Sequence, residues 1–317
     1  MRELLPTIDT WRAEGRGFGR AVLIRVFGNG PRPEGATLLV ADDGSIAGSV
    51  SGGCVEGAAA EEIVKARRTG QPRVMRFGIS DEQAWGVGLA CGATIDVLIE
   101  PELRADVEAA ARSASGVAVL TALPPDSPTA RSDDGLPADL DEVSKRLVAQ
   151  GRSATVATDE GQVFVETFAP PPRIVVFGAV QAAIPLVGMA RELGYRTVVA
   201  DAREAFASRD RFPRADEVIV GWPDEVASQV RLGPDDAVVV MSHDPKLDEP
   251  AIVEAMSAGC RYVGAMGSRK TQAGRRERLL AAGLTEDELA RLRGPIGLDL
   301  GGREPGEMAL AILAEIV

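Results

Sequence analysis

The second half of the chain alternates apolar, strand-like segments with helical segments, and this alternation restricts the fold more than any other feature of the sequence. Strands separated by helices are joined by right-handed crossovers, which produce a parallel sheet with helices on both faces. We therefore expect a doubly wound α/β domain over residues 173–317. The expected strands are Arg173–Phe177, Arg196–Ala200, Glu217–Val220, Ala237–Met241 and Arg261–Ala265, and the expected helices are Gln181–Leu193, Lys246–Ala258, Ser268–Ala282 and Pro305–Val317.

The first half, residues 1–168, predicts a mixed α+β domain whose strands are joined by hairpins rather than by helices. Residues 121–140 are rich in Pro, Asp and Ser and predict a surface loop. The proline-rich run at 169–172 predicts the linker between the two domains. Helices are expected over 2–14 and 56–68, and strands over 21–26, 36–40, 45–50, 73–77, 94–99, 154–158 and 162–167.

The composition of the chain limits which partners the protein can bind and in which cellular compartment we expect it. With 35 Lys+Arg against 47 Asp+Glu, the net charge of −12 argues against a protein built to hold nucleic acid by its backbone. The three cysteines, Cys54, Cys91 and Cys260, are too few and odd in number for a disulfide framework, which favours a reducing compartment. No apolar run approaches the roughly 18–20 residues that span a bilayer, and no signal peptide is recognisable. We expect a soluble cytoplasmic protein with no membrane partner.

A glycine-rich loop in the first half leads a cysteine into the helix expected from Glu56; it reads Gly48-Ser49-Val50-Ser51-Gly52-Gly53-Cys54-Val55-Glu56. Glycines let backbone N–H groups converge on an anion, and a helix N-terminus lowers the pKa of a nearby thiol. The loop therefore predicts a phosphate-type or thiolate-type site. The alternative is a tight strand-to-helix turn in which Cys54 packs as a small apolar residue.

The second half opens with an incomplete dinucleotide-binding turn. Gly178 and Ala183 match the first and third positions of Gly-x-Gly-x-x-Gly/Ala, and Asp201 supplies the acid expected about 20 residues later for a ribose. Val180 occupies the second position, where a glycine lets the backbone approach the pyrophosphate. The fold signal for a Rossmann-like domain is therefore strong, whereas NAD(P) binding is weakened by Val180.

Three further segments follow strands of the second half, where open sheets bind ligands. His243 is the only histidine and follows the fourth expected strand; it is either a structural histidine or a functional one. Gly267-Ser268-Arg269-Lys270 opens a basic helix and predicts a phosphate seat, or else a serine N-cap followed by a solvated face with Arg275, Arg276 and Arg278. A glycine-rich turn at 294–302, which contains Asp299, is expected to line the same crevice.

Long motifs on both halves together resemble the xanthine dehydrogenase accessory proteins, the XdhC/CoxI family. The first-half motifs are Gly28-Asn29-Gly30-Pro31-Arg32, the loop from Gly48 to Glu56, and Cys91-Gly92-Ala93-Thr94-Ile95-Asp96-Val97. The second-half motifs are Ser242-His243-Asp244-Pro245-Lys246-Leu247-Asp248, Tyr262-Val263-Gly264-Ala265-Met266-Gly267-Ser268-Arg269-Lys270 and Pro295-Ile296-Gly297-Leu298-Asp299. The chain departs from the family at Val180, where many members carry glycine, and at Ala93, where members often have Cys-Gly-Gly.

The resemblance implies a carrier that binds the molybdenum cofactor (molybdopterin), supports its sulfuration and delivers it to a molybdenum hydroxylase such as xanthine or carbon monoxide dehydrogenase. It implies the client apoenzyme and a cysteine desulfurase as partners, and such carriers are often homodimers. Soft thiolates from Cys54 or Cys91 suit the metal end of the cofactor, and the basic turn suits its phosphate. The expected binding residues are Gly52, Gly53, Cys54, Glu56, Cys91, Gly92, Gly178, Asp201, His243, Gly267, Ser268, Arg269, Lys270 and Asp299.

Two alternatives remain open from the sequence. The Rossmann-like alternation and Asp201 are also typical of an NAD(P)-dependent oxidoreductase that uses His243 as acid and base. A thiol-redox protein in which Cys54 and Cys91 approach each other is the other alternative. Because the dinucleotide turn is incomplete and two glycine–cysteine motifs occur, at Gly53-Cys54 and at Cys91-Gly92, we favour a non-catalytic cofactor carrier. Spacings typical of a structural metal site, such as Cys-x-x-Cys, do not occur.

Overall fold

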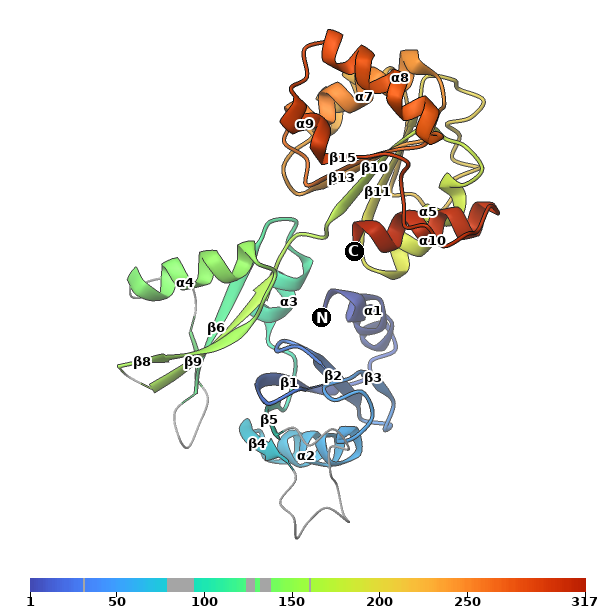
Figure 1. Ribbon diagram of the computed structural model, residues 1–317. Helices are drawn as coiled ribbons and strands as arrows, with labels where there is room; N and C mark the ends of the chain where they lie inside the picture. The colour runs from blue at the N-terminus through green and yellow to red at the C-terminus, as the bar shows by residue number, and fades with distance from the viewer. Residues whose placement is uncertain (31, 79–93, 124–128, 132–137, 160) are drawn as a thin grey trace. The chain divides into compact units, whose positions relative to one another are not determined.

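The computed structural model describes the whole chain except residues 31, 79–93, 124–128, 132–137 and 160 (Figure 1). The chain divides into two compact units, Met1–Pro170 and Pro171–Val317. None of the helices in the described ranges has the length and apolar character needed to cross a bilayer.

The C-terminal unit is built on a six-stranded parallel sheet with the strand order β12-β11-β10-β13-β14-β15. The predicted doubly wound fold is therefore confirmed. The edge strand β15 was not expected, because a segment of two residues has no periodicity that a sequence could reveal. The strands are β10 (Arg173–Phe177), β11 (Arg196–Asp201), β12 (Glu217–Val220), β13 (Asp236–Val240), β14 (Tyr262–Ala265) and β15 (Leu292–Arg293).

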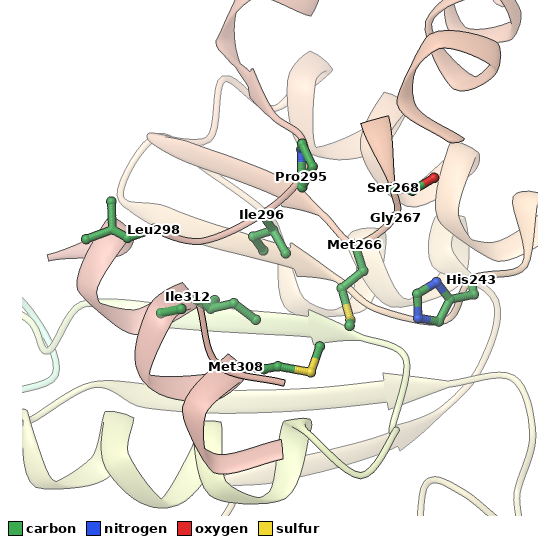
Figure 2. A pocket seen from close by; sticks show the side chains of 11 residues that line it. His243, Met266, Gly267, Ser268, Pro295, Ile296, Leu298, Met308 and Ile312 are labelled. Carbon is green, nitrogen blue, oxygen red and sulfur yellow. The ribbon is translucent and has the colours of Figure 1, made fainter. Parts of the chain in front are cut away.

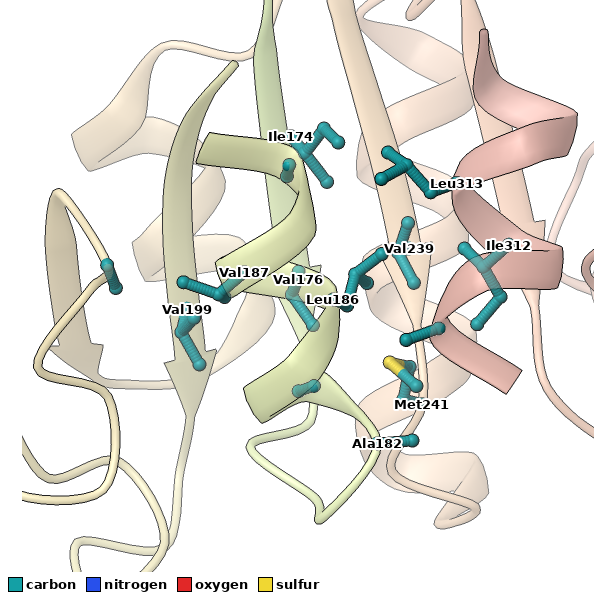
Figure 3. Close-up of a cluster of buried hydrophobic side chains, with 14 of the residues drawn as sticks. Ile174, Val176, Ala182, Leu186, Val187, Val199, Val239, Met241, Ile312 and Leu313 are labelled. Carbon is teal, nitrogen blue, oxygen red and sulfur yellow. The ribbon is translucent and has the colours of Figure 1, made fainter. Parts of the chain in front are cut away.

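Helices cover both faces of this sheet. One face packs against α5 (Ala183–Glu192) and α10 (Pro305–Ile316), whose apolar residues interlock with those of the central strands (Figure 3). The other face packs against four helices, and the two shortest of them escape sequence-based prediction because each spans only about two turns. These four are α6 (Pro223–Val230), α7 (Pro245–Ser257), α8 (Arg269–Ala281) and α9 (Glu286–Arg291).

The N-terminal unit contains a five-stranded antiparallel sheet with the order β3-β2-β1-β5-β4. Its hairpin connections confirm the mixed α+β prediction for this half. Helix α2 covers one face of the sheet, and the short N-terminal helices pack on the other. The elements are η1 (Arg2–Leu4), α1 (Leu5–Ala13), β1 (Phe18–Phe27), β2 (Thr37–Ala41), β3 (Ile46–Gly48), α2 (Glu56–Thr69), β4 (Arg73–Phe77) and β5 (Thr94–Glu100).

A second antiparallel sheet in the same unit has the order β7-β6-β9-β8. Of the surface loop predicted over 121–140, the described residues belong instead to β6, to β7, which pairs with β6, and to α4, which begins at Ala138. Residues 124–128 and 132–137 of that prediction lie outside the described residues. The pairing of β7 comes from its neighbour rather than from its own short sequence. The elements are α3 (Ala105–Arg112), β6 (Val117–Leu123), β7 (Thr129–Arg131), α4 (Ala138–Ala149), β8 (Ala154–Thr158) and β9 (Gly161–Phe168).

Candidate functional site at the carboxyl edge of the parallel sheet

The strand order reverses direction between β10 and β13, and the loops that follow these two strands meet at that point. Gly178, directly after β10, has a φ of 105°, and a Cβ atom there would lie 2.6 Å from the backbone nitrogen of Ser242 after β13. No residue with a side chain fits at this contact. The glycine of the incomplete fingerprint is therefore explained by close packing of the two loops.

His243 lies in the second of these loops with a φ of 63°, in the left-handed region that favours glycine. A non-glycine residue in this region is strained, and such strain is concentrated at functional sites. The loop is fixed on both sides of the histidine. The side chain of Asp244 caps α7 by accepting a hydrogen bond from the Lys246 nitrogen at 3.0 Å, and the Ser242 hydroxyl donates to Asp248 at 2.6 Å.

His243, Gly267 and Ser268, three of the predicted binding residues, line one cavity of about 330 Å³ (Figure 2). Its walls are mostly apolar. The other lining residues are Met266, Pro295, Ile296, Leu298, Gly302, Met308, Ala311 and Ile312. Asp299 is exposed and does not belong to this lining, although its neighbour Leu298 does.

A buried ion pair holds two walls of the cavity together. The Arg275 guanidinium donates from Nη2 to Oδ2 of Asp248 at 2.8 Å, and both side chains are at most 3% exposed. Asp248 also accepts from Ser242 beside His243, whereas Arg275 donates to the carbonyl oxygen of Met266 at 2.9 Å. The pair therefore couples the loop after β13 to the loop after β14. Arg275 does not lie on a solvated face, which corrects the alternative interpretation of the basic run.

The start of α8 places two cations, Arg269 and Lys270, beside the carboxyl edge of the sheet. Ser268 is the N-cap residue and accepts a hydrogen bond from the Thr271 nitrogen at 3.2 Å. Arg269 and Arg276 line a second cavity of about 470 Å³, which shares Pro295 with the first. Within the residues that the structure describes, neither Arg269 nor the exposed Lys270 forms an ion pair. The helix N-terminus and these two charges together favour an anion.

Asp201, at the end of β11, is fully occupied by its own chain. Its carboxylate accepts from the Ala179 nitrogen at 2.9 Å and from the Arg203 guanidinium at 2.8 Å, and its side chain has no exposed surface. Burial alone would raise the pKa of Asp201, but the hydrogen bonds from Arg203 outweigh burial and lower it. A ribose would have to displace Arg203. Since Val180 also packs against the apolar core, this edge is poorly suited to NAD(P).

The glycine-rich loop of the N-terminal unit does converge on an anion, and that anion is the carboxylate of Glu56. Ser49 and Ser51 each donate a hydroxyl hydrogen bond to it at 2.6 Å, and the Gly53 nitrogen donates at 2.9 Å. Burial alone would raise the pKa of Glu56, but the hydrogen bonds from Ser49 and Ser51 outweigh it and lower the pKa to about 2. An external anion would have to displace this carboxylate.

Cys54 and Cys260 differ in exposure. Cys54 is exposed on the glycine turn, so the alternative that it packs as a small apolar residue is not supported. Cys260 is buried, and burial raises the pKa of its thiol to about 11. Cys91 and Gly92 lie outside the described residues. Within the described part of the chain, no group of three or more His, Cys, Asp and Glu side chains is arranged to hold a metal ion.

Sequence reasoning missed four residues of this site: Met266, Met308, Asp248 and Arg275. Met266 stands inside one of the motifs that carry the family resemblance, but no sequence pattern marks a methionine as a cavity residue, so only the cavity reveals Met266 and Met308. Asp248 had a usable signal, because it ends the motif that begins at Ser242 and lies four residues after the cap residue Asp244, which places both on the same face of the helix. The burial of Arg275 had none, since it stands in a run of exposed charges.

Comparisons with known proteins match both units of the chain to the same family. A family model described as the XdhC Rossmann domain matches residues 174–316, and a model described as the XdhC and CoxI family matches residues 11–78. The chain is 28% identical over 312 residues to a Bacillus subtilis (strain 168) protein named as a probable xanthine dehydrogenase subunit, and the match covers 94% of this chain and 91% of that protein.

A second relative is "Molybdenum cofactor insertion chaperone PaoD" of Escherichia coli (strain K12), which is 28% identical over 310 residues, or 95% of this chain and 83% of the relative. Among solved structures, one described as a xanthine dehydrogenase from Bacillus halodurans superimposes with a TM-score of 0.80. It is 26% identical, and the match covers 98% of this chain and 94% of that chain.

Proposed function

Because this chain belongs to the XdhC and CoxI family, we propose that it is a maturation factor that binds the molybdenum cofactor and delivers it to a molybdenum enzyme of the xanthine dehydrogenase type. The name of the Escherichia coli relative as an insertion chaperone supports this role, since the two chains match over most of their lengths. Carbon monoxide dehydrogenase is the alternative client.

One observation carries the binding part of the proposal: a cavity and a cationic helix start adjoin at the carboxyl edge of the parallel sheet. The molybdenum cofactor has a pterin ring and a terminal phosphate. The cations Arg269 and Lys270, with the amides at the start of α8, suit the phosphate. The apolar walls beside His243, Gly267 and Ser268 suit a ring. These residues bind and orient the cofactor and keep water from part of its surface.

We assign Cys54 to the metal end of the cofactor. Its thiol is exposed on a turn that the Glu56 hydrogen bonds keep rigid, so a bulky ligand or a sulfur-donating protein can reach it. Thiolates are suitable ligands for soft metal centres. Cys91 is the second proposed thiol, a cysteine desulfurase the proposed source of sulfur for the cofactor, and a homodimer the proposed assembly.

The proposal is tested by anaerobic binding of isolated molybdenum cofactor to the purified full chain. Losing two charge-assisted hydrogen bonds, each worth about 1.5–3 kcal/mol, weakens binding at least tenfold, so R269A/K270A should bind the cofactor poorly. The matched control is R191A/R196A, which removes two exposed cations where α5 ends and β11 begins, away from the carboxyl edge. A wild-type chain that retains no cofactor, or equal binding by both double variants, would overturn the proposal.

A further inference from the structure

Three side chains with nitrogen or sulfur donors reach one cavity from three separate segments of the C-terminal unit. His243 comes from the loop after β13, Met266 directly follows β14, and Met308 belongs to the first turns of α10. Figure 2 shows the imidazole ring and both thioether sulfurs directed into the same space. All three line the cavity of about 330 Å³.

The chemistry of these donors selects a narrow class of ligand. Thioethers are soft, neutral and polarizable, and together with imidazole they prefer Cu(I) among biological metal ions. Magnesium, calcium and manganese need carboxylate or carbonyl oxygens, and no Asp or Glu is among the described residues that line this cavity. We propose that the cavity binds one Cu(I) ion through His243, Met266 and Met308.

The local electrostatics favour a monovalent ion over a divalent one. The N-terminus of α8 begins at Ser268 on the same cavity, and its field opposes cations and favours anions. Because all three donors are neutral, the bound charge stays at one for Cu(I), whereas Zn²⁺ would bring two charges without any compensating thiolate or carboxylate. The volume leaves room beside the ion for a further anionic ligand at the helix start.

The donors are held in place by the fold itself. Arg275 fixes the backbone of Met266 through its carbonyl oxygen, and its partner Asp248 fixes Ser242 next to His243. Met266 and Met308 both pack against the buried core cluster, which limits their rotamers. His243 has a backbone conformation in the left-handed region, and strain of this kind is typical of functional positions.

The copper ion and the pterin ring of the proposed function are alternative occupants of this one cavity. The copper inference does not depend on the cofactor proposal, because its test uses copper alone. Cu(I) is titrated anaerobically with ascorbate as reductant, in competition with the chelator bicinchoninate. The protein is the full chain with C54S/C91S, since cysteine thiolates would also bind copper. Leucine conserves the volume of methionine and removes the sulfur, so M266L/M308L is the main variant. The matched control is M75L/M189L, which changes two methionines that do not line this cavity.

We expect one Cu(I) per C54S/C91S chain, with nitrogen and sulfur scatterers around the ion in X-ray absorption. M266L/M308L and H243Q should each bind at least tenfold more weakly, whereas M75L/M189L should match the parent. Circular dichroism and thermal melting verify that each variant is folded. Equal copper affinity in M266L/M308L and its control, or binding of Zn²⁺ in preference to Cu(I), would overturn the inference.

Discussion

The carboxylate of Asp248 on α7 and the guanidinium of Arg275 on α8 form an ion pair of 2.8 Å with side-chain exposures of only 1% and 3%. Removing one member leaves the other charged and buried without compensation, which costs about 3–5 kcal/mol. We therefore expect R275M and D248N each to lower the free energy of unfolding by several kcal/mol in urea titrations of the full chain.

The double variant D248L/R275M separates the charge effect from a packing effect. Because it removes both charges together, its loss of stability should be smaller than the sum of the two single losses. Additive losses would mean that the two side chains act independently, and would contradict the coupling of the two cavity loops.

Glu56 should make the free energy of unfolding fall as the solution becomes acidic. Its ordinary pKa is 4.5 and its folded pKa is about 2, so its contribution is fully present above about pH 4.5 and is lost as the pH falls toward 2. At neutral pH, E56Q should lower the free energy of unfolding by about 1–3 kcal/mol, since glutamine removes the negative charge and replaces one of the two acceptor oxygens with an NH2 donor.

Urea titrations of wild type and E56Q at several pH values check this expectation. The difference between the two proteins should shrink as the pH falls below 4.5, because protonation removes the same charge from the wild type. A difference that stays constant down to the lowest accessible pH would show that the carboxylate charge does not stabilise the glycine-rich loop.

Two substitutions at His243 separate the cost of its backbone conformation from the contribution of its imidazole to copper binding. A left-handed φ of 63° costs a residue with a Cβ atom roughly 1–2 kcal/mol relative to glycine, partly offset by the greater unfolded-state freedom of glycine. H243G should therefore be at least as stable as H243A in thermal melts, although both lack the imidazole and should bind copper equally poorly. A clearly less stable H243G would contradict the strain.

Sequence reasoning succeeded where a local pattern decides the structure. The valine-rich strands predicted the parallel sheet, and the segments that follow them placed His243, Gly267 and Ser268 at its carboxyl edge, where all three line one cavity. It failed where distant contacts decide the structure. The short strand β7 depends on pairing with β6, and the burial of Arg275 depends on a carboxylate 27 residues earlier.

The glycine-rich loop illustrates a further limit. Its sequence correctly indicated converging amides, but no pattern distinguishes a loop awaiting an external anion from one whose own Glu56 occupies it. The same holds for Asp201, which has the position of a ribose-binding acid but is paired with Arg203. In both cases the ligand-like group comes from within the chain.

These internal contacts predict weak binding of nicotinamide dinucleotides. With Asp201 paired to Arg203 and Val180 packed on the core, NAD+ and NADPH should bind more weakly than about 10 μM, or about −7 kcal/mol. V180G alone should not restore tight binding, because the acid remains occupied. Isothermal titration calorimetry checks both chains, and tight binding by wild type would favour the oxidoreductase alternative.

The two described cysteines should differ in reactivity. Cys54 is exposed, whereas Cys260 is buried and its pKa is raised to about 11, so very little of Cys260 is thiolate at neutral pH. In a C91S chain, iodoacetamide should modify Cys54 at least about 100-fold faster than Cys260, because only the thiolate is nucleophilic. Mass spectrometry of the digested protein resolves the two sites, and denaturation in urea should make the rates similar. If Cys54 in the folded chain reacted as slowly as Cys260, its thiol would be inaccessible to a cofactor or a sulfur donor, and its assignment to the metal end of the cofactor would fail.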